Sequence, residues 1–286
     1  MIKIILFYLL FNLLSCESDN KDKSEQTKLG LLFLYSRFQS RPINYDSVQY
    51  YYSSMKSLEI QVAYETGAEP NAGSITLPNS TTLTTWGILE ENLKEVFKNR
   101  SQAVSFTIPK ELTSMTQIPT QNKTSWTISE ILNLSNSYRT NKSTADTGRF
   151  FIVFLNGYYS ENGNNNQNVI GVNISGTPII AIFKQVINST GNSITIIGRA
   201  TRVYVEQSTL VHEMGHALGL VNNGVPLTTQ HQDTQNGAHC NNTLCVMYYA
   251  NTGTTALVNY IQSYLNSGSA VMIKSECLQD TQSYKP

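Results

Sequence analysis

Residues 211–220 read Val211-His212-Glu213-Met214-Gly215-His216-Ala217-Leu218-Gly219-Leu220, and this stretch decides the fold class. On a helix, the side chains of His212 and His216 lie four residues apart on one face, close enough to share one metal ion. Glu213 between them can reach a water molecule on that ion. The chain has 4 histidines, and two of them fall in this stretch. The spacing is typical of zinc hydrolases rather than of a helix whose histidines only satisfy local hydrogen bonds.

The flanking residues predict where this helix begins and ends. Ser208 and Thr209 are candidate N-caps, because a hydroxyl there can accept a hydrogen bond from the first helical turn. Gly219 fits the position after the helix, where the backbone takes a positive φ, and residues 222–224 read Asn-Asn-Gly, a turn sequence. Apolar side chains recur at helical spacing on the opposite face: Leu210, Met214, Ala217 and Leu218.

A catalytic zinc ion needs a third protein ligand and one open position. A glutamate from a later helix is nearly excluded, because Glu276 is the only glutamate after Glu213. Two histidines follow the motif, His231 and His239, and Asp233 is a more distant candidate. From the residues alone, these side chains are the alternatives for the third ligand.

A segment further along the chain resembles a known signature. Residues 237–247 read GAHCNNTLCVM and resemble the H-C-x4-C-x-M signature of the archaemetzincins. The chain is thus similar to a metzincin-type zinc metallopeptidase of an archaemetzincin-related bacterial lipoprotein group. Metzincins share the longer pattern H-E-x-x-H-x-x-G-x-x-H, but here Asn222, a poor zinc ligand, stands at the last position. By this resemblance an enlarged loop delivers His239 as the third ligand, with His231 as the alternative.

The resemblance also implies a mechanism, that of a zinc-dependent endopeptidase acting on protein or peptide substrates. Glu213 would take a proton from a zinc-bound water and pass it to the leaving amine. Met247 would form the Met-turn beneath the metal-bound histidines, and Tyr249 would help to stabilise the oxyanion. The ligands of the Zn²⁺ ion would be His212, His216 and His239.

The cysteines allow two interpretations. Archaemetzincins bind a second, structural zinc through the two cysteines after the histidine and a later C-x-x-C. The corresponding residues here are Cys240, Cys245, Cys277 and Asp280, which stands in place of the last cysteine. Apart from Cys16, the chain has three cysteines, an odd number that cannot all pair. In an exported protein this favours one disulfide, from Cys245 to Cys240 or Cys277, together with a buried free thiol.

The hydrophobic pattern and the resemblance predict an α+β fold, a metzincin-like zincin domain. An upper subdomain of about 44–221 would hold a mixed twisted sheet with helices, and a small, mostly irregular lower subdomain of about 222–286 would end in a C-terminal helix. The predicted strands are residues 57–64, 103–108, 150–155, 169–174 and 179–183. The predicted helices are residues 86–97, 128–134 and 256–265. Residues 178–182 are expected to lie nearest the cleft and to bind extended peptide by β-augmentation.

The N-terminus predicts the compartment. Residues 1–15 have a basic start and a short apolar core, as in a secretory signal peptide. They lead into Leu13-Leu14-Ser15-Cys16, which resembles a bacterial lipobox with lipidation at Cys16. Leu14 is bulkier than the usual residue, so ordinary cleavage and secretion is the alternative. Residues 16–43 would then be a lipidated flexible tether and residues 44–286 the catalytic domain, held at the outer membrane or cell surface rather than in the cytoplasm.

Charge composition argues against one class of partner. The chain carries 20 basic and 20 acidic residues without a basic stripe, so nucleic acid is not an expected partner. We expect a monomer. Two other classes of function stay open: a surface binding module or adhesin that keeps zinc without turnover, and a structural envelope lipoprotein with a chance motif.

Overall fold

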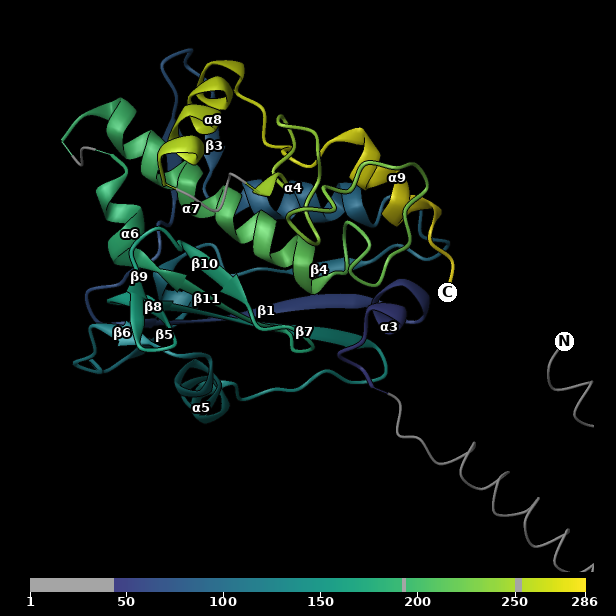
Figure 1. Cartoon of the computed structure of the whole chain (residues 1–286), viewed down its shortest axis with the longest axis horizontal. Helices are drawn as coiled ribbons and strands as arrows, with labels where there is room; N and C mark the ends of the chain where they lie inside the picture. Colours follow the sequence, from purple (N-terminus) through teal and green to yellow (C-terminus); the bar gives the residue numbers. More distant parts are fainter. Residues whose placement is uncertain (1–43, 192–193, 250–253) are drawn as a thin grey trace, which may run out of the picture. The chain divides into compact units, whose positions relative to one another are not determined.

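A mixed six-stranded sheet forms the centre of the fold, and the helix that carries the motif lies across one of its faces (Figure 1). The computed structural model describes residues 44–191, 194–249 and 254–286. Tyr45–Pro286 form one compact unit. The predicted signal peptide, the lipidation site Cys16 and the tether of residues 16–43 lie outside the described residues. Each helix in the described part of the chain is too short or too polar to cross a membrane.

Two long parallel strands, β1 (Ser57–Glu65) and β7 (Thr147–Leu155), form the middle of the sheet. Residues 150–155 of β7 are almost fully buried. A strand that is covered on both faces can be a continuous apolar run, which is why Phe-Phe-Ile-Val-Phe-Leu forms a central strand here. The strands predicted at residues 57–64 and 150–155 are confirmed.

The side of the sheet nearest the motif ends in an antiparallel strand. β11 (Ile179–Phe183) is parallel to β7, and β10 (Gly171–Asn173) pairs with β11 as the edge strand. The expectation that residues 178–182 lie nearest the cleft was wrong, because β11 is hydrogen-bonded on both sides. Its five fully buried residues fit an interior strand, whereas β10 is only half-buried.

Shorter strands complete the framework. On the other side of β1 lie β4 (Ser105–Thr107) and β5 (Thr116–Ile118). A hairpin is formed by β2 (Ser74–Thr76) and β3 (Thr82–Thr84). A second small sheet consists of β6 (Ser125–Trp126), β8 (Tyr158–Glu161) and β9 (Asn164–Asn166), and a 3-10 turn spans Leu112–Ser114.

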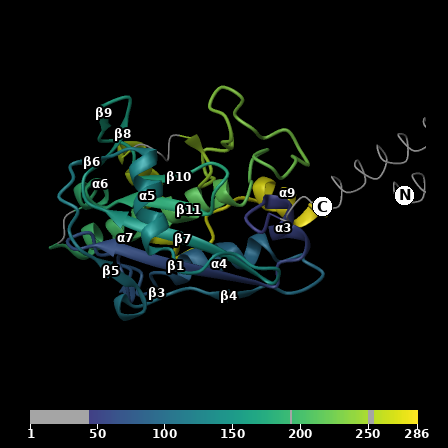
Figure 2. The ribbon, with the colours of Figure 1, turned by 90° about the horizontal axis from the view of Figure 1, so that it is seen from below.

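The helices form layers on the two faces of the sheet. On one face α7 (Ile196–Ala217) contacts β10, β11, α4 (Gly87–Val96) and α8 (Thr254–Ser267), and α4 in turn contacts α9 (Ser275–Ser283). On the other face α5 (Ile128–Tyr138) lies over β7 and β11 (Figure 2). The remaining helices of the described residues are α3 (Val48–Ser53) and α6 (Lys184–Ser189). The helices predicted at residues 86–97, 128–134 and 256–265 are confirmed, and α9 is an additional one.

Helix α7 is longer than its sequence pattern suggested. It begins at Ile196, where the Thr195 side chain accepts a hydrogen bond from the Gly198 N–H at 3.0 Å. The predicted caps Ser208 and Thr209 therefore lie in its interior, where both are buried. The helix ends at Ala217, and Gly219 has a φ of 83°, as expected for the residue that reverses the chain.

A buried ion pair joins α7 to the segments that follow β11 and β1. The Glu206 carboxylate is fully buried and pairs with Lys184, the first residue of α6. It also accepts hydrogen bonds from the backbone N–H of Asn71 at 2.7 Å and from the Asn71 side chain at 2.8 Å. A buried charge with this many partners restricts how α7 can rotate or slide, and the motif lies two turns further along the same helix.

Candidate metal centre

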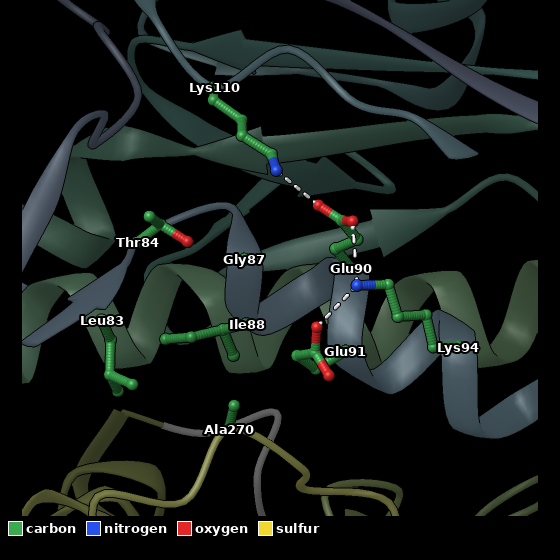
Figure 3. Close-up of a pocket in the computed structure, with 9 residues that line it drawn as sticks. All are labelled: Leu83, Thr84, Gly87, Ile88, Glu90, Glu91, Lys94, Lys110 and Ala270. Carbon is green, nitrogen blue, oxygen red and sulfur yellow. Dashed lines mark hydrogen bonds and ion pairs between the residues drawn. The ribbon is translucent and has the colours of Figure 1, made fainter. Parts of the chain in front are cut away.

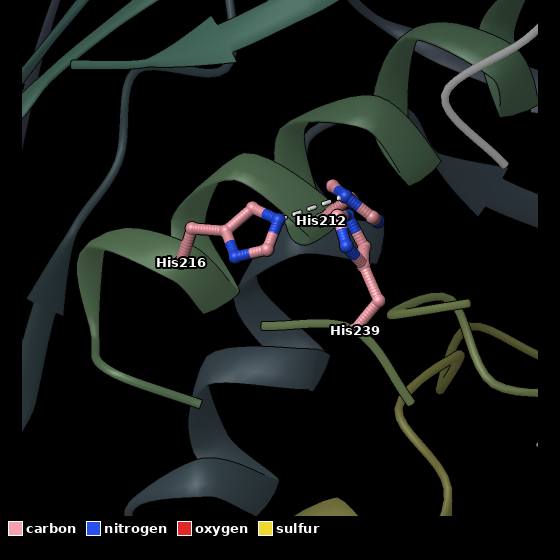
Figure 4. Close-up of side chains that lie close together, drawn as sticks. All are labelled: His212, His216 and His239. Atoms are coloured by element: carbon pink, nitrogen blue, oxygen red, sulfur yellow. Dashed lines mark hydrogen bonds between the residues drawn. The ribbon is translucent and has the colours of Figure 1, made fainter. Parts of the chain in front are cut away.

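Helix α7 brings the two motif histidines together, as their spacing predicted. The Nε2 atoms of His212 and His216 lie 3.0 Å apart (Figure 4). His212 is buried and His216 is partly buried, one turn later at the end of the helix. Two ring nitrogens this close, both on the same face of the helix, can occupy two coordination positions of one metal ion.

The third histidine of the cluster is His239, from the long segment between α7 and α8. Its ring centroid lies 5.2 Å from that of His212 and 4.9 Å from that of His216. One ring nitrogen from each histidine lies within 4.8 Å of those of the other two. Figure 4 shows His239 pointing toward His212 and His216 from a separate segment of the chain.

Backbone carbonyls select the ring nitrogens that face the centre. His212 Nδ1 lies 2.7 Å from the Val246 carbonyl oxygen, and His239 Nδ1 lies 2.6 Å from that of Asn236. A carbonyl oxygen only accepts hydrogen bonds, so both Nδ1 atoms carry the proton and donate it. Their Nε2 atoms then carry the lone pairs that a metal ion would bind, the usual arrangement around a ligating histidine.

The residues present fit a metal ion, and one buried atom indicates this directly. The His239 Nε2 is buried, and among the described residues it has no hydrogen-bond partner. A buried acceptor without a partner costs about 1–3 kcal/mol, which coordination to an ion would remove. Burial lowers the pKa of His212 to about 4, reinforced by His239, and it lowers that of His216 as well. Both imidazoles are therefore neutral at pH 7, the form that binds metal ions.

Glu213 lies beside the cluster and is buried. Its Oε2 atom accepts a hydrogen bond of 2.6 Å from the backbone N–H of Asn173 in the edge strand β10. Burial raises the pKa of Glu213 to about 7, and the hydrogen bond from Asn173 opposes part of that rise. A carboxyl group with a pKa near neutrality can both take and return a proton.

The segment around Met247 supports this centre from below. Met247 is fully buried and packs against Gly215, which lies between the two motif histidines. The Met247 carbonyl accepts the Cys240 N–H at 2.9 Å, next to His239. Because the Val246 carbonyl also orients His212, one short segment braces two of the three imidazoles. Tyr249 is partly exposed and packs edge-on against Tyr248, so its predicted role in stabilising an oxyanion stays a prediction.

Asn222 and Asp233 form turns in the loop after α7, and Asp233 is not part of the histidine cluster. Asn222 has a positive φ of 61°, and its side chain bonds to Gln232 at 3.1 Å. Asparagine tolerates this backbone conformation, so its residue type suits a turn at the position where metzincins have a histidine. Asp233 accepts hydrogen bonds from Gln235 and Asn236 and so shapes the turn before His239.

His231 belongs to a second, fully buried cluster rather than to the first. It lies with Cys240 and Cys277 in a group whose ligand atoms are within 4.8 Å of one another. Its Nδ1 is 3.5 Å from the Cys240 sulfur and 3.9 Å from the Cys277 sulfur. Cys245 is 3.6 Å from Cys277, sulfur to sulfur. Two thiols and one imidazole are therefore mutually close, and the third thiol, Cys245, adjoins them through Cys277.

The geometry of this second cluster differs from both sequence interpretations. The three cysteines are free thiols, and 3.6 Å far exceeds the ~2.05 Å of a disulfide bond. Asp280 does not join the sulfurs, because its Oδ2 lies 2.6 Å from His231 Nε2 and its Oδ1 accepts two hydrogen bonds from Thr228. The sequence could not reveal that His231 takes this place, since it lies 46 residues before Cys277 and outside the C-x-x-C spacing.

The neighbouring residues His239 and Cys240 belong to different clusters. Residues 231–233 and 239–241 pair antiparallel, with hydrogen bonds from the Asp233 N–H to the His239 carbonyl at 2.7 Å and from the Asn241 N–H to the His231 carbonyl at 2.8 Å. Successive side chains of an extended segment point to opposite sides. His239 therefore enters the first cluster while its neighbour Cys240 enters the second.

A small hollow elsewhere on the surface does not take part in this site. It has a volume of about 170 Å³ and lies beside α4 and the β2–β3 hairpin (Figure 3). Its charged groups are already paired, with Lys110 2.7 Å and Lys94 3.1 Å from Glu90. No histidine or cysteine is among the side chains that line it.

Comparison with known proteins finds only distant likeness. No protein-family model matches the sequence, and no curated protein matches it. A zinc-dependent peptidase from Methanocorpusculum labreanum (strain Z) is 12% identical over 78% of this chain and 99% of that chain, with a TM-score of 0.41. Archaemetzincin from Methanopyrus kandleri is 14% identical over 80% of this chain and 94% of that chain, with a TM-score of 0.36.

Proposed function

We propose that this protein is a zinc-dependent endopeptidase of the metzincin type. The observation that carries the proposal is the convergence of three imidazoles, with the buried carboxylate of Glu213 beside them. The ligands would be His212, His216 and His239. When bound there, Zn²⁺ would polarise the scissile carbonyl and lower the pKa of a water molecule to roughly 7.

The chain's own residues would supply the remaining chemistry. Glu213 would accept the proton of the attacking water and later give it to the leaving amine, which its raised pKa allows. The Val246 and Asn236 carbonyls would keep two imidazoles in the tautomer that faces the centre. An extended peptide would pair with the edge strand β10, in place of the interior strand β11.

A Glu213→Ala variant tests this assignment. Zinc content measured by mass spectrometry should stay at the parental level, because Glu213 is not among the clustered ligands. The rate of hydrolysis of an unfolded protein mixture should fall by roughly 10²–10⁴-fold, the usual contribution of a general base to the rate. The parent should also lose activity with a chelator and regain it with zinc. Full activity in the variant contradicts the mechanism, and a zinc-loaded parent without hydrolysis favours a binding module or adhesin.

The second cluster would hold a structural zinc ion through Cys240, Cys245, Cys277 and His231. Four ligands without an open position are typical of structural zinc sites. Backbone N–H groups of Asn242 and Lys274 lie 3.4 Å from the Cys240 and Cys245 sulfurs and would stabilise thiolates there. Asp280 would orient His231 from the far side of its ring.

Metal counting distinguishes the two sites. The parent should bind two zinc ions per chain, and Cys277→Ser should bind fewer and unfold at a lower temperature. Asp280→Asn keeps the four ligands, so we expect its zinc affinity at this site to fall by only about 10–100-fold. One zinc ion in both the parent and Cys277→Ser would show that the cysteines hold none.

The predicted location requires a separate test. Residues 1–43 would carry a signal peptide and a lipid on Cys16 that hold the domain at the outer membrane or cell surface. Mass spectrometry of the mature N-terminal peptide should find acyl chains on Cys16, and Cys16→Ser should release the protein from the membrane fraction. An unmodified Cys16 in a soluble fraction would favour simple secretion.

A further inference from the structure

We infer that the backbone N–H of Asn173 positions Glu213, so that the edge strand of the sheet sets the orientation of the general base. The inference rests on the proposed function and adds a positioning group to it. It comes from a contact between elements far apart in the sequence, since Asn173 and Glu213 are 40 residues apart. The hydrogen bond between them is 2.6 Å long.

The hydrogen bonds of the sheet show why this N–H is available. Ile170 accepts from the Phe183 N–H at 2.8 Å, and Ile174 donates to the Ile179 carbonyl at 3.0 Å. In an antiparallel pair, hydrogen bonding to the partner alternates along the strand. The backbone groups of Gly171 and Asn173 therefore point away from β11, toward the open edge. At the Asn173 N–H, the Glu213 carboxylate is the acceptor that a further strand would otherwise provide.

A glycine permits the close approach of helix and strand. A Cβ atom on Gly171 would lie 2.7 Å from Thr209 Cγ2 and 3.2 Å from Glu213 Cγ. Both distances are too short for ordinary contacts, so any side chain at position 171 would push α7 and β10 apart. The absence of that side chain lets the Glu213 carboxylate reach the Asn173 amide.

The edge strand holds this amide firmly. The Asn173 side chain donates to the carbonyls of Ile179 at 3.2 Å and of Thr177 at 3.4 Å, across the turn between β10 and β11. These bonds fix the end of β10, and with it the direction of the N–H. One carboxylate oxygen of Glu213 is thereby anchored, which leaves Oε1 as the oxygen to receive a proton.

The same arrangement limits how a peptide can bind. A peptide added along β10 finds the Asn173 N–H already used by Glu213. The peptide can form hydrogen bonds with the N–H and carbonyl of Gly171 and with the carbonyl of Asn173. Loss of the Asn173 N–H should therefore affect the chemical step more than peptide binding.

Two variants at one position separate the N–H from the side chain. Asn173→Pro removes the N–H, and proline is tolerated at an edge strand where the N–H points outward. Asn173→Ala removes the same side-chain hydrogen bonds but keeps the N–H. With zinc content matched, kcat of the proline variant should fall at least about tenfold below that of the alanine variant, at similar KM. Equal kcat in two folded variants would overturn the inference.

An NMR measurement tests the inference without enzymatic turnover. It applies even if the parent lacks peptidase activity or the proline variant does not fold. In protein with ¹⁵N-labelled asparagine, the Asn173 amide proton should resonate downfield and exchange slowly. Glu213→Ala should move it upfield and raise its exchange rate by roughly tenfold or more, because the charged acceptor is gone. An unchanged Asn173 resonance would overturn the inference, whatever the activity assays give.

Discussion

Gly215 of α7 lies directly against Met247: a Cβ atom on Gly215 would lie 3.0 Å from Met247 Cε and closer still to its sulfur. The contact joins the motif helix to the segment that braces His212 and His239. Met247 can occupy its position only because residue 215 has no side chain. The metal centre and the packing beneath it are therefore one structural unit.

Gly215→Ala should destabilise the protein by about 1–3 kcal/mol, because the new methyl group overfills a closely packed contact. Thermal unfolding measures the change, and zinc affinity should fall with it. Met247→Ala in the same chain makes room for the methyl group, so the double variant should lose less than the sum of the two single changes. Additive losses would show that the two residues do not interact.

Thr195→Ala should cost about 1 kcal/mol, since it removes the cap of α7. Hydrogen exchange at the Gly198 amide should increase, because that N–H loses its acceptor. Ser208→Ala is the matched control: Ser208 lies inside the helix and donates to Val205, so Gly198 exchange should not change. Faster exchange at Gly198 in the Ser208 variant would place the start of the helix elsewhere.

His239→Ala and His231→Ala should remove different metal ions. Cobalt substitution distinguishes them, because only a site with thiolate ligands gives sulfur-to-cobalt charge-transfer bands. His239→Ala should abolish hydrolysis and leave those bands in place, since His239 faces the histidine cluster. His231→Ala should weaken the bands, because His231 lies beside the cysteine sulfurs. The reverse pattern would exchange the two assignments.

Glu130 should stabilise the protein fully above its ordinary pKa and progressively less as the pH falls toward 2. Hydrogen bonds from Lys123 and then from Thr127 lower its pKa from 4.5 to about 2. Because the folded state favours the charged form, the contribution is complete above about pH 4.5 and is lost as the pH falls toward 2. Glu130→Gln should therefore be less stable than the parent at pH 7 and equal to it near pH 2. A pH-independent difference in unfolding free energy would contradict this assignment.

Local spacing made part of the site predictable. His212 and His216 meet because four residues make about one helical turn, and Glu213 lies between them for the same reason. The strands at residues 57–64 and 150–155 were predictable because their apolar patterns depend on burial alone. The start of α7 was not, because Thr195 lies 17 residues before His212, and Ser208 is an equally good cap by residue type.

The helix of the motif, the central strands and the residue types suited to zinc could be read from the sequence, because these follow from short-range spacing and hydrophobicity. The folded chain alone shows that His231 joins Cys240 and Cys277 while His239 joins His212, since each cluster combines side chains from separate segments. It also shows that β10 is the edge strand and that its Asn173 N–H meets Glu213. Such contacts depend on strand order and helix placement, which arise when distant segments pack together and leave no local pattern in the chain.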